Sequence, residues 1–138
     1  MSILGLDLGK RRIGIAIADT PVLGVRPLAT LVRGSLPRDF DALRALAVDW
    51  QVRRIILGLP LNMNGSEGPS AQSARAFARN FAARSPLPIL MWDERFSTAA
   101  VIRTLIDSDA SRKRRAEVVD KMAAGYILQG VLDRLRNA

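Results

Sequence analysis

The sequence predicts an α/β fold in one domain, residues 1–138, with helices packed on the faces of a mixed β-sheet. Its length fits a single compact domain. Short apolar runs and segments of helical periodicity follow one another in the order β-β-β-α-β-α-β-α-α. The first two connections are tight, so the first three strands form an antiparallel meander. Helices then separate the later strands, which is typical of a mixed sheet covered by helices.

The expected strands are short apolar runs bounded by turn residues. Residues 3–8 are apolar apart from Asp7, a composition typical of a central strand. The second strand alternates between isoleucine and small residues, so its two faces differ in size. Pro27 favours an edge position for the third strand. The five expected strands are residues 3–8, 13–18, 25–32, 54–59 and 87–92.

Apolar residues at helical spacing predict four helices. The first extends from about Leu36 to Trp50, and Pro37 suits its first turn. Two others are expected around residues 74–81 and 98–106. The last helix, residues 116–136, is expected to turn five side chains toward the core: Val119, Met122, Ala123, Tyr126 and Ile127.

The composition excludes several kinds of chemistry. The chain has no cysteine and no histidine, which excludes thiolate nucleophiles, histidine-based triads and the usual catalytic zinc site. Hydrolysis would have to use carboxylates, Lys, Tyr, Ser or Thr, or a metal ion held by oxygen ligands. The net charge of +8 favours nucleic acid as a partner, because neutralised phosphates supply much of that affinity. The apolar N-terminal run is too short to span a membrane.

Asp7 is the first candidate for a site residue because it lies at the end of an apolar strand. On the pleat it shares a face with Ile3 and Gly5. If that face meets the small residues of the next strand, at positions 14, 16 and 18, there is room beside the carboxylate for a hydrated metal ion and a phosphodiester. The alternative is an Asp7 that only accepts hydrogen bonds from the turn at Gly9.

Two further segments place carboxylates at the ends of elements. Asp93 and Glu94 follow the fifth strand directly, and adjacent strand residues face opposite sides, so only one of them can face Asp7. Asp120 lies early in the last helix, where the helix dipole alone would favour it. Three such carboxylates without histidine would form an oxygen-rich cage suited to Mg²⁺ or Mn²⁺, and two such ions can promote phosphodiester cleavage.

The segment after the fourth strand is expected to form a loop. Asn64-Gly65 is its turn signal, and its backbone could line a groove. The loop lacks the Gly-Lys-Ser/Thr ending of a Walker A motif. Gly68-Pro69 opens the following helix, where backbone N–H groups attract anions.

Basic residues adjoin each acidic segment in the sequence. They are expected to flank the site and to contact phosphates, and the alternative for the run at 112–115 is a solvated loop. The expected nucleic-acid-binding residues are Arg11, Arg12, Arg95, Arg112, Lys113, Arg114 and Arg115.

Four motifs together resemble the YqgF/RuvX family over nearly the whole chain. They occur in the family's order: the strand-turn-strand at residues 7–16, the loop at 58–65, Asp-Glu-Arg-Phe-Ser-Thr at 93–98 and Asp-Lys-Met-Ala-Ala at 120–124. The resemblance implies an RNase H-like fold of the RuvC type with a five-stranded mixed sheet. It also implies an acidic, metal-binding and catalytic triad of Asp7, Glu94 and Asp120, and so favours Glu94 over Asp93.

The activity implied by the resemblance is metal-dependent hydrolysis of phosphodiester bonds. The expected substrate is the 5′ end of pre-16S rRNA, with branched DNA at a Holliday junction as the alternative, in the cytoplasm and as a monomer or homodimer. Two other functions stay open. The opening strand-turn-strand also looks like that of actin/Hsp70-type ATPases, although those hold nucleotide between two such domains. A non-catalytic RNA-binding module could keep the carboxylates for structure.

Overall fold

The computed structural model describes residues 2–19, 24–93 and 123–134. Along these residues the elements follow in the order β1 (Ser2–Leu8), β2 (Arg12–Asp19), β3 (Val25–Val32), α1 (Leu36–Asp49), β4 (Val52–Leu59), α2 (Pro69–Ala82) and β5 (Ile89–Asp93). Residues 123–134 form a further helical segment. The expected α/β fold with a five-stranded mixed sheet is confirmed. The helix expected at residues 98–106 lies outside the described residues.

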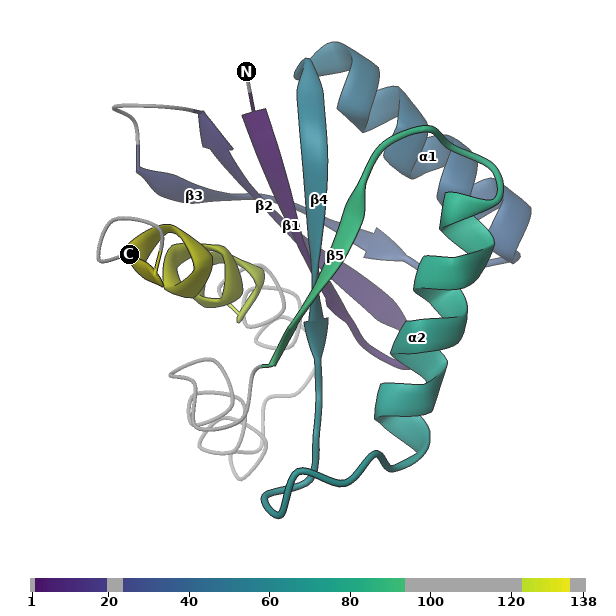
Figure 1. Cartoon of the computed structure of the whole chain (residues 1–138). Helices are drawn as coiled ribbons and strands as arrows, with labels where there is room; N and C mark the ends of the chain where they lie inside the picture. The colour runs from purple at the N-terminus through teal and green to yellow at the C-terminus, as the bar shows by residue number, and fades with distance from the viewer. Residues whose placement is uncertain (1, 20–23, 94–122, 135–138) are drawn as a thin grey trace, which may run out of the picture.

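The sheet has the order β3-β2-β1-β4-β5, with β1 in the centre (Figure 1). β1 pairs antiparallel with β2, and β2 pairs antiparallel with β3, which is the expected meander. β1 pairs parallel with β4, and β4 pairs parallel with β5. The carboxyl ends of β1, β3, β4 and β5 therefore lie at the same edge of the sheet, together with the start of β2.

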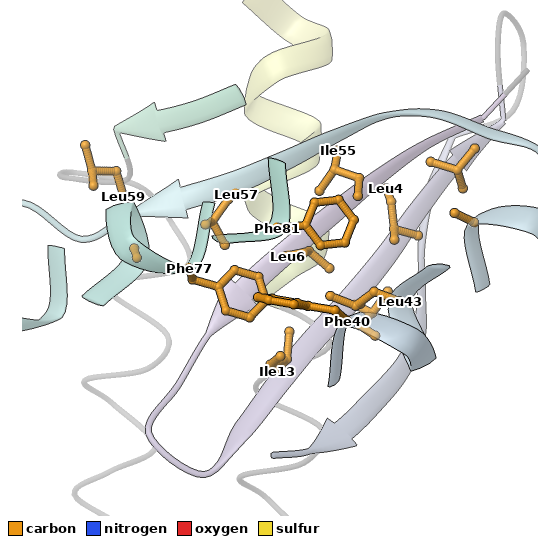
Figure 2. Close-up of a cluster of buried hydrophobic side chains, with 14 of the residues drawn as sticks. Leu4, Leu6, Ile13, Phe40, Leu43, Ile55, Leu57, Leu59, Phe77 and Phe81 are labelled. Atoms are coloured by element: carbon orange, nitrogen blue, oxygen red, sulfur yellow. The ribbon is translucent and has the colours of Figure 1, made fainter. Parts of the chain in front are cut away.

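One face of the sheet packs against α1 and α2. Leu4 and Leu6 from β1 point to this face, and both side chains are fully buried. Phe40 of α1 contacts two rings of α2 edge-on, with its centroid 5.1 Å from Phe77 and 5.5 Å from Phe81 (Figure 2). Edge-to-face pairs of this kind are stabilised by about 0.5–1.5 kcal/mol beyond their burial. The periodicity expected for both helices is confirmed.

The other face packs against the helical segment 123–134 (Figure 1). Small residues of the sheet allow this close approach. A Cβ atom on Gly5 would lie 3.0 Å from Cβ of Leu128 and 3.1 Å from the carbonyl oxygen of Ala124. The buried face of the segment consists of Ala123, Ala124, Ile127, Leu128 and Val131.

The expectation that Tyr126 points inward is wrong, because its side chain is 37% exposed. Ile127 and Leu128 face the sheet, and Tyr126 lies on the exposed side of the helix. Ala123 and Ile127 are buried as expected, and Val119 and Met122 lie outside the described residues.

Candidate active site at the carboxyl edge of the sheet

Asp7 lies at the edge of the sheet where β1, β4 and β5 end, and only 4% of its surface is exposed. In the sheet register Asp7 is opposite Gly14, and Gly5 is opposite Ala16. The face of β1 that carries Asp7 therefore meets the small face of β2, as expected. The helical segment 123–134 occupies much of the space over Gly5, so the small residues also serve helix packing. A carboxylate this deeply buried is costly unless polar or cationic groups surround it.

A tight turn follows Asp7 and holds the end of β1. The Gly9 N–H donates to the carbonyl oxygen of Arg12 at 2.8 Å. A Cβ atom on Gly9 would lie 2.8 Å from the same oxygen, which is closer than real Cβ contacts allow. The turn carries Arg11, which is exposed, and leads into Arg12, which is half-buried. Both basic residues thus lie at the same edge of the sheet as Asp7.

A hollow of about 490 Å³ opens between this turn, the end of β4 and the first turns of α2. It is lined by Asp7, Leu8, Gly9, Lys10, Arg33, Gly58, Pro60, Pro69, Ser70 and Ser73. The loop at residues 58–65 was expected to line a groove, and Gly58 and Pro60 from it do line this hollow. Within the loop, the Gly65 N–H donates to the carbonyl oxygen of Asn62 at 2.8 Å, which forms the expected turn.

Asp93 ends β5 and pairs with Leu59 of β4. Along β5, Ile89 and Met91 pack against the core of α1 and α2, whereas Trp92 packs with the segment 123–134. Strand alternation therefore directs Asp93 away from the face that carries Asp7. This agrees with the expectation that only one of the two acidic residues at this strand end can face Asp7.

The structure brings three of the expected site residues, Asp7, Arg11 and Arg12, to one edge. The other expected site residues lie outside the described residues: Glu94, Asp120, Arg95, Arg112, Lys113, Arg114 and Arg115. In the part of the chain that the structure describes, no three acidic residues come together as a metal site. Asp7 supplies the oxygen ligands that Mg²⁺ and Mn²⁺ prefer, so the described part of the site fits such an ion.

Sequence reasoning missed four residues of the hollow: Lys10, Arg33, Ser70 and Ser73. Arg33 follows the third strand directly. In an antiparallel meander the end of this strand lies beside the start of the second, so topology alone could have placed Arg33 at the site. The two serines lie in the first two turns of the helix that was expected to attract anions.

The sheet order, the helices on both faces and the carboxylate that ends the central strand define an RNase H-like domain of the RuvC type. RuvC of Thermus thermophilus superposes with a TM-score of 0.58 at 12% identity, covering 99% of this chain and 97% of that chain. The fowlpox virus Holliday junction resolvase superposes with a TM-score of 0.54 at 14% identity, covering 98% and 99%. These two likenesses establish the fold.

The chain belongs to the RuvX family, described as "Holliday junction resolvase", which matches residues 1–134. A relative in Cereibacter sphaeroides is 56% identical over 134 residues, which are 97% of this chain and 84% of that protein. A relative in Paracoccus denitrificans is 53% identical over 135 residues, which are 98% and 85% of the two chains. Both relatives are named "Putative pre-16S rRNA nuclease". No helix among the described residues is long and apolar enough to cross a membrane.

Proposed function

We propose that this chain is a single-domain, metal-dependent nuclease that cleaves phosphodiester bonds at the 5′ end of pre-16S rRNA in the cytoplasm. The observation that carries the proposal is Asp7, a carboxylate only 4% exposed, at the end of the central strand and beside an open hollow. Family membership and the name of the curated relatives support the same activity and substrate.

Glu94 and Asp120 complete the proposed acidic site. Trp92 packs on the face of the sheet that carries Asp7. Residues two apart in a strand share a face, so a strand continued past Asp93 would carry Glu94 on the same face as Asp7. Asp120 precedes, by three residues, the helical segment that packs on that face at Gly5. The first observation supports Glu94 rather than Asp93 as the proposed partner of Asp7, and the second supports Asp120.

Asp7, Glu94 and Asp120 would hold Mg²⁺ or Mn²⁺ through carboxylate oxygens. A bound divalent ion supplies charge stabilisation to phosphate oxygens during hydrolysis. Arg11 and Arg12, at the turn beside Asp7, would bind phosphates of the strand and orient it across the edge. A chain without histidine has no imidazole base for this reaction, so positioning and charge fall to its carboxylates and arginines.

The test is cleavage of a pre-16S rRNA 5′ fragment and a four-way DNA junction side by side, with and without Mn²⁺. We expect Mn²⁺-dependent cleavage of the RNA, and loss of cleavage in Asp7→Asn. The matched control is Asp49→Asn, which removes one exposed carboxylate at the end of α1. Cleavage that persists in Asp7→Asn would refute the proposed site.

Resolution of Holliday junctions is the second candidate, because the family description names it and the fold is that of RuvC. A resolvase would act as a homodimer, whose two-fold symmetry places two sites across two strands. Faster cleavage of the DNA junction than of the RNA would favour this candidate. RNA binding without cleavage of either substrate would instead indicate a non-catalytic RNA-binding module.

A further inference from the structure

We propose that the hollow beside Asp7 is a binding site for a backbone phosphate of the nucleic-acid strand, with Arg33 as its principal contact. The inference rests on the proposed function and adds a subsite to it. Arg33 is not part of the motifs that mark the acidic site. It reaches the hollow because β3 ends at the same edge of the sheet as β1.

The Arg33 side chain and the backbone that carries it are both held in place. Its Nη1 donates to the carbonyl oxygen of Gly9 at 2.8 Å, and its backbone N–H donates to the carbonyl oxygen of Arg11 at 2.8 Å. The guanidinium lies over the ring of Phe77, 6.0 Å from the ring centroid. The next backbone N–H, that of Gly34, donates to the buried carboxylate of Asp39 at 3.0 Å. These contacts pre-order the guanidinium, which lowers the entropy lost on binding a ligand.

Most hydrogen-bonding capacity of this guanidinium is not used by the described residues. A guanidinium has five N–H donors, and one of them is engaged by Gly9. Arg33 forms no ion pair with a carboxylate among residues 2–19, 24–93 and 123–134. By contrast, four other arginines of the described residues pair with carboxylates: Arg26 with Asp19, Arg38 with Asp39, Arg44 with Asp41 and Arg75 with Glu67. A half-buried, ordered guanidinium with unused donors is suited to bind phosphate.

The rest of the hollow has room for a phosphate group and carries side chains that can bind one. Its volume of about 490 Å³ lies within the range of about 300–1,000 Å³ that is usual for ligand sites. Lys10 adds a second cation, and Ser70 and Ser73 of α2 add hydroxyl-bearing side chains to the lining. Two cations against the single carboxylate of Asp7 leave the lining net positive. A phosphate held by Arg33 would anchor the strand while a neighbouring phosphodiester lies at Asp7.

The test measures the salt dependence of binding of a short fluorescein-labelled single-stranded RNA to the full chain in EDTA, where cleavage is suppressed. Arg33→Gln should reduce the slope of log K against log salt by about 0.7, the value for one phosphate contact on a single strand. At about 0.1 M salt this corresponds to binding that is about 5-fold weaker. Lys10→Gln, at an exposed position, should change the slope in the same direction.

The matched control is Arg54→Gln, which removes the same charge from an exposed position near the start of β4, at the opposite edge of the sheet. It should leave the slope unchanged. In a cleavage assay with Mn²⁺, Arg33→Gln should raise KM and leave kcat unchanged, which a loss of folded protein would not do.

An unchanged slope in both Arg33→Gln and Lys10→Gln, in a chain that binds and cleaves RNA, would overturn the phosphate subsite alone. Absence of RNA and DNA binding by the unaltered chain would overturn the proposed function and the subsite with it.

Discussion

Gly5→Ala should push the helical segment 123–134 away from the face that carries Asp7. The added Cβ would lie 3.0 Å from Cβ of Leu128 and 3.1 Å from the carbonyl oxygen of Ala124, a backbone atom that cannot rotate away. Because ordinary contacts begin near 3.4 Å, the helix must retreat by several tenths of an ångström. Overpacking of this kind costs about 1–3 kcal/mol. The stiffer unfolded chain offsets about 0.4–1 kcal/mol of that cost.

The net expectation is therefore a loss of about 1–2 kcal/mol in the free energy of unfolding, measured by urea denaturation. The rate of cleavage should also fall, and by more than the small loss of folded protein explains, because Asp120 precedes the displaced helical segment by three residues in the chain. Gly24→Ala is the matched control, since a Cβ atom at that position would meet nothing within 4 Å. If Gly5→Ala unfolds at the same urea concentration as Gly24→Ala and cleaves equally well, the close approach of the helix to β1 is not a determinant of the site.

Three further predictions concern the turn and the charges at the site. Gly9→Ala should lower the free energy of unfolding by about 1–3 kcal/mol in urea, because its Cβ would lie 2.8 Å from the carbonyl oxygen of Arg12; an unaltered midpoint would contradict the turn geometry. Asp7→Asn should leave the metal-free melting temperature unchanged or slightly higher, because it relieves repulsion within the acidic site, while cleavage falls by orders of magnitude. A destabilised variant that still cleaves would show that Asp7 anchors the turn instead. Neutralising Arg114 and Arg115 together should lower the salt slope of RNA binding by up to about 2 units, and no change would mean that the run is solvated.

The order of the elements could be predicted from the sequence because alternation and helical spacing are strong signals here. The third strand has the expected bounds, Val25–Val32. The fourth begins two residues earlier than expected, at Val52, because the exposed Arg53 and Arg54 separate the buried Val52 from the continuous buried run that starts at Ile55. The fifth begins two residues later, at Ile89, although the carbonyl oxygen of Pro88 already accepts a bond from Ile55.

The candidate site was only partly accessible from the sequence. Asp7 could be identified because a charge that ends an apolar strand is unusual. The choice between Asp93 and Glu94 required the family motif, because the sequence pattern alone does not show which side of β5 faces Asp7. Arg33 has no motif around it, and its role depends on which strand ends lie side by side. The inward position of Tyr126 was wrong because a continuous apolar run does not define which side of a helix faces the sheet.

The central position of β1 has a consequence for the order of folding. Its pairing with β2 joins near neighbours in the chain, whereas its pairing with β4 joins Ile3 to Arg54 across about fifty intervening residues. Local pairs close quickly and distant parallel pairs close slowly, so the meander should form before β4 docks. Until then β1 exposes an apolar edge with unpaired backbone groups, which is prone to aggregate. The strand that bears Asp7 is thus exposed to aggregation until β4 docks. A variant that slows this docking should lower the yield of folded protein before it alters the rate of cleavage.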